Sequence, residues 1–159
     1  MCIVIDANRL PSVLNPRSSD HIEFQSILDW IGKRRTKIIY GGTKYNDELG
    51  RMGKYFGILT EMKRAGKVKE LDKATVDCIQ DDINQRTTHR NFNDQAIVAI
   101  IIASRTRLLC SHDTASLPFV RTRNLYPRGI EPPKIYRDRR DHRLLYHRDL
   151  NGHCGPCCR

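Results

Sequence analysis

The chain lacks any apolar run of the ~20 residues that a membrane-spanning helix requires. Its longest run, residues 96–103, holds only eight Ala, Ile and Val side chains. The apolar run at residues 2–5 is shorter still and Asp6 interrupts it, so we expect no signal peptide. These absences predict a cytoplasmic protein without a membrane partner.

The six cysteines do not form the regular framework of a small disulfide-rich protein. Cys2, Cys78 and Cys110 lie within apolar or helical patterns, which predicts buried thiols. The remaining three gather near the C-terminus with two histidines, in the set His147, His153, Cys154, Cys157 and Cys158. Structural Zn²⁺ uses such ligands, but the segment offers no second half at matching spacing, so a disordered basic tail is favoured over a zinc site.

Acidic residues are in deficit, because 28 Lys and Arg stand against 18 Asp and Glu, a formal charge of +10. The deficit is greatest in residues 121–159, which hold ten basic and four acidic side chains. Such a charge favours nucleic acid as the partner and an acidic protein next, although solubility alone would also explain it. Tyr126, Tyr136 and Tyr146 recur in this stretch, where they could stack on bases or pack in the core.

Segments of strand and helix character alternate along the chain. We predict strands at residues 1–5, 37–40, 68–71, 107–111 and 134–136, and helices at 12–15, 20–34, 43–65, 73–86, 92–104 and 114–121. This alternation indicates an α/β fold with a doubly wound parallel sheet and helices on both faces. The length of 159 residues suits one domain, residues 1–138, followed by a basic C-terminal extension, residues 139–159, that we expect to be flexible.

Residues 91–113, NFNDQAIVAIIIASRTRLLCSHD, place two acids where a parallel sheet would bring them together. Asp94 opens the apolar helix and Asp113 follows the next strand, as Asp6 follows the first strand. The C-terminal ends of parallel strands form the functional edge of such a sheet, and a covering helix begins at that same edge. Three carboxylates should therefore converge there, with Asp47 or Glu48 available as a fourth.

Each acid alone has a simpler explanation. An Asp that opens a helix is usually its cap, and an Asp after a strand often starts a turn. Gathered together, however, carboxylates repel one another unless cations or protons compensate their charge. One or two Mg²⁺ or Mn²⁺ ions, which prefer oxygen ligands, would compensate it.

At these residues the chain resembles the PIN domain family of metal-dependent ribonucleases. The resemblance spans residues 1–120 and rests on four motifs in order: IVIDAN, DEL, NDQAIVAIIIA and LLCSHD. It implies that four acids bind the metal and catalyse hydrolysis, namely Asp6, Glu48, Asp94 and Asp113. It also implies supporting polar positions at Asn8 and Ser111.

The resemblance further implies an endoribonuclease that hydrolyses RNA. Many members of the family are toxins of toxin–antitoxin pairs, so an antitoxin or another protein inhibitor is an expected partner. Lys44, Arg51 and Arg90 are candidates to contact RNA phosphates, although each could be an ordinary solvated charge. A non-catalytic RNA-binding or scaffold protein, a structure-specific DNA nuclease and a homo-oligomer remain open alternatives.

Overall fold

One parallel sheet organises the chain in the computed structural model, which describes residues 1–33, 36–147 and 150. The strands are β1 (Cys2–Ile5), β2 (Lys37–Tyr40), β3 (Val68–Glu70), β4 (Leu108–Cys110) and β5 (Lys134–Tyr136). They lie in the order β3-β2-β1-β4-β5, and every neighbouring pair is parallel. All five strands that the sequence predicts are present, including the weak candidate at β3.

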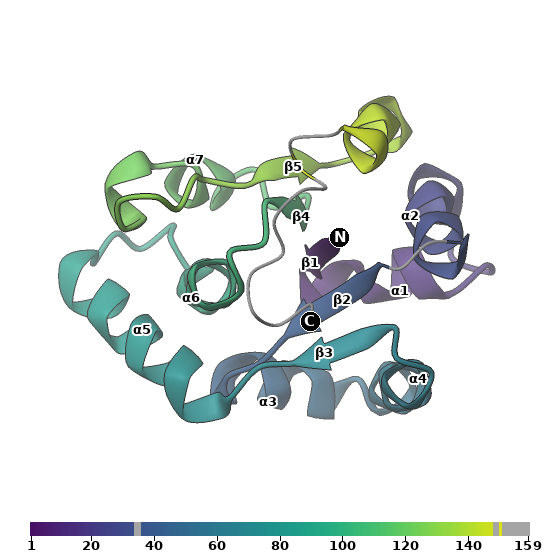
Figure 1. Ribbon diagram of the computed structural model, residues 1–159, viewed down its shortest axis with the longest axis horizontal. Helices are drawn as coiled ribbons and strands as arrows, with labels where there is room; N and C mark the ends of the chain where they lie inside the picture. The colour runs from purple at the N-terminus through teal and green to yellow at the C-terminus, as the bar shows by residue number, and fades with distance from the viewer. Residues whose placement is uncertain (34–35, 148–149, 151–159) are drawn as a thin grey trace.

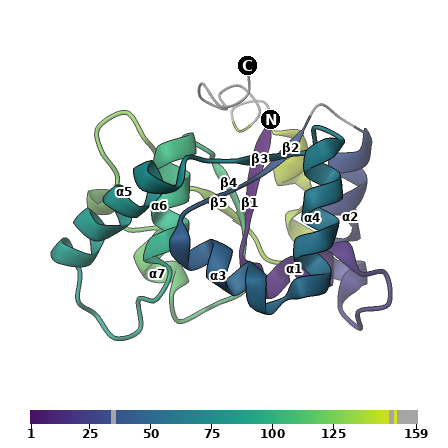
Figure 2. The same cartoon turned by 90° about the horizontal axis from the view of Figure 1, so that it is seen from below.

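Helices lie on both sides of the central strands, with α5 and α6 on one side and α1 and α2 on the other (Figures 1 and 2). The α-helices are α1 (Leu10–Leu14), α2 (His21–Lys33), α3 (Thr43–Arg51), α4 (Gly53–Arg64), α5 (Lys73–Arg86), α6 (Gln95–Ser104) and α7 (Leu117–Val120). Short 3₁₀ helices are η1 (Ala7–Arg9), η2 (Arg123–Leu125) and η3 (Arg139–Tyr146). The α/β architecture is confirmed, and the arrangement is compatible with a doubly wound fold.

The core is centred on α6, which packs on α5 and contacts β1 and β2. Seven consecutive residues of α6, Ala96 to Ile102, are buried, as expected for a helix that is apolar around its circumference. Cys110 is a buried thiol as predicted. Cys2 is buried but disulfide-bonded, and Cys78 is a thiol that lies exposed on α5, so the prediction of a buried thiol is wrong for both. Within the described residues no helix has both the length and the apolar character needed to cross a membrane.

The helix predicted at residues 43–65 is divided into α3 and α4. The division falls at Met52, whose φ of −107° and ψ of 44° are not helical. Gly50 and Gly53 flank this residue, and glycine is the poorest helix former after proline. The break lets α3 follow the sheet edge, whereas α4 turns away from it and packs on β3 (Figure 2).

The order of the strands reverses between β1 and β4. The chain first builds outward from β1 through β2 to β3, then returns to place β4 on the other side of β1. In open parallel sheets such a reversal leaves a crevice beyond the C-terminal strand ends, where ligands bind. Asp6 directly follows β1 and Ser111 directly follows β4, so both residues stand at this position.

The ordered chain continues beyond the domain boundary that we predict at Asp138. Residues of η3 pack against α2 and β5, and Leu145 is fully buried. The Arg139 backbone N–H also donates to Glu23 Oε2 of α2 at 3.3 Å. The extension is therefore structured through η3, while the tail residues His153, Cys154, Cys157 and Cys158 lie outside the described residues.

We expect Leu145→Ala to lower the free energy of unfolding by about 2–4 kcal/mol, because it removes a buried side chain and leaves a cavity. Arg143→Ala in the same 3₁₀ helix is the control, since that side chain is exposed and its loss should change stability by less than about 0.5 kcal/mol. Urea denaturation measures both. Equal stability of the two variants would show that η3 does not belong to the folded domain.

Candidate carboxylate site

Asp6 is buried at the junction of β1 and β4, with 5% of its surface exposed. Its backbone N–H donates to the Cys110 carbonyl at 2.9 Å, which continues the pairing of the two strands. Ser111 Oγ donates to Asp6 Oδ2 at 2.9 Å, and the Asn8 backbone N–H donates to Oδ1 at 3.0 Å. The Ser111 side chain thus contacts Asp6 directly, whereas Asn8 contributes its backbone and its side chain is exposed.

Asp94 stands at the N-terminal end of α6 but does not cap it. Its side chain makes no capping hydrogen bond, and its Oδ2 atom is buried without a hydrogen-bond partner among the described residues. Burial raises the pKa of Asp94 to about 6; the nearby Ser116 hydroxyl opposes this shift, and the charges of Asp6 and Asp113 add to it. The capping explanation of this acid therefore fails, and a strained, half-buried carboxylate is left at the site.

Asp113 lies in the turn after β4, close enough to Asp94 for its charge to act there. Its Oδ1 atom accepts the N–H groups of Ala115 at 3.0 Å and Ser116 at 3.2 Å, so the turn explanation holds for that oxygen. Its charge nevertheless acts on Asp94. Asp113 both shapes the turn into α7 and contributes a negative charge to the site.

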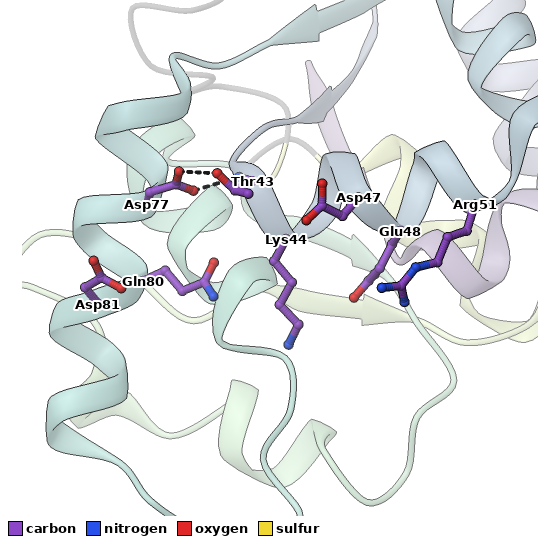
Figure 3. Close-up of a pocket in the computed structure, with 8 residues that line it drawn as sticks. All are labelled: Thr43, Lys44, Asp47, Glu48, Arg51, Asp77, Gln80 and Asp81. Carbon is purple, nitrogen blue, oxygen red and sulfur yellow. Dashed lines mark hydrogen bonds between the residues drawn. The ribbon is translucent and has the colours of Figure 1, made fainter.

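Glu48 is the fourth acid, and α3 holds it near Asp6. Burial raises the pKa of Glu48; Lys44 and Arg51 oppose the shift, and the charge of Asp6 adds to it. Asp47 is exposed and points the other way from α3, whereas Lys44, Glu48 and Arg51 project together (Figure 3). We call Asp6, Glu48, Asp94 and Asp113 the carboxylate edge.

Helix α3 is docked in place by its first residues. Gly42 precedes it with a φ of 81°, and a Cβ there would lie 2.6 Å from Val76 Cγ1 of α5. The Thr43 N–H then donates to Asp77 Oδ1 at 2.7 Å, and its hydroxyl donates to the other oxygen. A cleft of about 470 Å³ remains between α3 and α5, and Lys44, Glu48 and Gln80 are among its lining residues (Figure 3).

Of the predicted phosphate contacts, only Lys44 is held at the carboxylate edge. Its Nζ donates to the Asn93 carbonyl, immediately before Asp94, and its charge opposes the rise in the pKa of both Glu48 and Asp94. Arg51 and Arg90 are exposed, Arg51 on α3 and Arg90 in the loop before α6. Because both side chains are exposed, each can bind a phosphate without giving up a contact in the core.

No protein-family model matches this chain, and no curated protein or solved structure matches it either. The argument about its site therefore depends on its own residues.

Those residues suit a hard divalent cation by their chemistry. All four acids offer oxygen, and among the described residues the buried Asp94 Oδ2 atom has no hydrogen-bond partner, so it can accept a ligand's charge. Within the described part of the chain, no three His, Cys, Asp or Glu side chains are arranged to hold a metal ion as they stand. Side-chain rotation or substrate would have to bring the acids closer.

Two residues of the site were not predicted from the sequence. Ser116 is buried beside Asp94, and its hydroxyl has no hydrogen-bond partner among the described residues. Tyr45 is buried on α3 and donates its hydroxyl to the Ile5 carbonyl, and burial, Asp6 and Glu48 together raise its pKa. Ser116 follows Asp113 by three residues and Tyr45 precedes Glu48 by three, spacings of one helical turn that could have indicated both.

The raised pKa of Asp94 predicts an unusual dependence of stability on pH. The folded state holds a proton on Asp94 up to about pH 6, whereas the unfolded state releases it near pH 3.8, so stability should fall as pH rises through this window. Asp94→Asn cannot ionise, so it should be more stable than the parent at pH 8 by roughly 1–3 kcal/mol. Urea denaturation in EDTA at pH 3.5 and pH 8 measures the difference.

The two proteins should have nearly equal stability at pH 3.5, where Asp94 is protonated in both states. Asp29→Asn removes an exposed acid of α2 and serves as the control, with little change at either pH. A parent protein that is as stable as Asp94→Asn at pH 8 would show that Asp94 is not under electrostatic strain.

Proposed function

We propose that this protein is a PIN-like, metal-dependent endoribonuclease. The observation that carries the proposal is Asp94, whose buried Oδ2 atom has no hydrogen-bond partner within the part of the chain that the structure describes and which feels the charges of Asp6 and Asp113. A folded protein tolerates such mutual repulsion at a functional site more often than elsewhere, because the strain is relieved when a cation binds. The location beyond β1 and β4, where the strand order reverses, also supports a ligand site.

The carboxylate edge would hold one or two Mg²⁺ or Mn²⁺ ions. When bound, such an ion lowers the pKa of water and neutralises the charge that develops on a phosphate during hydrolysis. Asp6 is oriented for this role by Ser111 and by the Asn8 backbone N–H. Lys44 supplies positive charge beside Glu48 and Asp94, which would also help to hold the phosphate.

The substrate proposed is RNA, and its products would carry a 5′ phosphate and a 3′ hydroxyl. The net charge of +10 supports a polyanionic substrate, and the exposed side chains of Arg51 and Arg90 are available to contact its backbone. The role we favour is that of a toxin in a toxin–antitoxin or defence pair, whose protein inhibitor would cover the carboxylate edge.

We expect the purified protein to cleave single-stranded RNA with Mn²⁺ or Mg²⁺ and to stop when EDTA is added. Asp94→Asn and Asp6→Asn should each reduce the rate by roughly two orders of magnitude or more while the fold is retained. The change in rate can be followed with end-labelled RNA, and the product ends can be mapped. Asp29→Asn removes the same charge far from the site and should cleave at the parental rate.

Cleavage that survives in Asp94→Asn, or that continues in EDTA, would contradict the proposal. If RNA is bound but never cleaved by the parent protein, a non-catalytic RNA-binding protein on the same fold becomes the better conclusion. Preference for branched or flapped DNA over RNA would favour the structure-specific DNA nuclease.

The neighbouring acids Asp47 and Glu48 provide a matched pair. Both acids line the cleft, but Glu48 projects with Lys44 and feels the charge of Asp6, whereas Asp47 is exposed and points away from them (Figure 3). Glu48→Gln should therefore lower the cleavage rate about 10- to 100-fold, and Asp47→Asn should have little effect. Initial rates at saturating Mg²⁺ measure both variants. Equal loss in the two would mean that the cleft needs negative charge in general and that Glu48 has no specific role.

A further inference from the structure

Three aromatic rings lie in series beside the carboxylate edge. Phe92 and Phe119 are stacked with ring centroids 5.6 Å apart and planes at 27°, and His89 meets Phe119 at 4.6 Å and 35°. We call these three residues the aromatic shelf. It runs outward from the core, because Phe92 is only 3% exposed, Phe119 is half-buried and His89 is exposed.

The exposed end of the shelf opens onto a surface hollow. Thr87, Thr88, Arg90, His89 and Phe119 line it, and its volume is about 630 Å³. The Asn91 backbone N–H donates to His89 Nδ1 at 3.2 Å, which holds the ring in place and leaves Nε2 as the N–H position. The hollow therefore presents a held aromatic ring next to an arginine.

Hydrogen bonds tie the shelf to the carboxylate edge. Phe92 precedes Asp94 by two residues, and Gln95 Nε2 donates to the Phe92 carbonyl at 2.6 Å. On the other side, the Phe119 N–H donates to the carbonyl of Ser116, which lies beside Asp94, at 3.0 Å. The shelf and Asp94 are therefore held by the same short segments, residues 89–95 and 116–119.

Packing alone does not explain the outer ring. Phe92 and Phe119 anchor the loop at residues 87–94 to α7 through apolar contact, but His89 is exposed and adds little buried area. An aromatic face beside a cationic side chain is the arrangement by which proteins bind unpaired nucleotides, because every base can stack on it while the charge holds the backbone. Tyr126 and Tyr136, which the sequence suggested for stacking, are buried and cannot serve.

We propose that the aromatic shelf binds one unpaired base of the RNA substrate, adjacent to the phosphate held at the carboxylate edge. The base stacks on His89, with Phe119 behind that ring and Arg90 at the backbone. This inference rests on the proposed function for its choice of RNA. It predicts a requirement for single-stranded RNA with little preference among bases, because stacking tolerates any base.

The test uses the full chain in the Asp94→Asn background with Mg²⁺ present, so that RNA binds without cleavage. Short single-stranded RNAs carry 2-aminopurine at one position in turn, and its fluorescence is quenched when the base stacks. We expect quenching at one position in the complex. His89→Ala and Phe119→Leu should each abolish that quenching and weaken binding about 5- to 100-fold.

Phe56→Leu is the matched control, because Phe56 is an aromatic side chain of α4 that is 46% exposed. Helix α4 lies away from α6 and α7 (Figure 2). It should leave both quenching and affinity unchanged. Circular dichroism would show whether Phe119→Leu disturbs the fold. If it does, His89→Ala alone tests the shelf, because the His89 side chain is exposed and its loss should leave the fold intact.

Unchanged quenching and affinity in His89→Ala overturn the shelf proposal, and so does an absence of RNA binding by the background protein. Cleavage by the unsubstituted chain is measured separately. If the parent protein cleaves RNA but His89→Ala binds normally, the nuclease proposal stands and the shelf proposal is wrong. If His89→Ala weakens binding but the parent protein does not cleave RNA, the shelf is an RNA-binding surface and the nuclease proposal is wrong.

Discussion

The parallel pairing of β1 with β4 is the constraint on which the rest of the site depends. It joins residues more than a hundred positions apart, and its last hydrogen bonds place Ser111 Oγ 2.9 Å from Asp6 Oδ2. The pairing also sets the strand order, since β2 and β3 occupy one side of β1 and β4 and β5 the other. Without this pairing Asp6 and Asp113 would not share an edge of the sheet.

Electrostatic repulsion at that edge is only partly relieved within the protein. Asp6 has partners for both oxygens and Asp113 has backbone donors for one, but the Asp94 Oδ2 atom has none among the residues that the structure describes. The positive charge of Lys44 acts on Asp94, and it acts on Glu48 as well. The energy that the sheet and α6 gain from burying apolar surface therefore supports an arrangement of acids that is unfavourable by itself, which is typical of sites that act on a ligand.

The two proposals describe two kinds of contact with one RNA strand. The carboxylate edge would act on the phosphate through charge, whereas the aromatic shelf would act on a base through stacking. The loop at residues 87–94 connects the two, because it carries His89 and Phe92 and ends at Asp94. Lys44, which donates to the Asn93 carbonyl, fixes the end of that loop to α3.

The chain by itself determined the secondary structure and the candidate acids. The apolar character of residues 96–103 predicts a buried helix, and the alternation of segments predicts a parallel sheet, because these are local patterns that burial enforces. Local pattern also indicates Asp6, Asp94 and Asp113, since each follows a strand or opens a helix. Local pattern did not predict where the domain ends. The sequence of η3 is mostly polar, and Leu145 is its one buried residue.

Only the tertiary structure decided which of these residues act together. Whether Asp94 caps α6 depends on where its oxygens point, and the choice between Asp47 and Glu48 depends on how Gly42 and Thr43 dock α3 against α5. The aromatic shelf was invisible for the same reason, since His89 and Phe119 are thirty residues apart and meet only when α7 returns beside α6. Side-chain contacts between distant segments follow from packing, which no local spacing encodes.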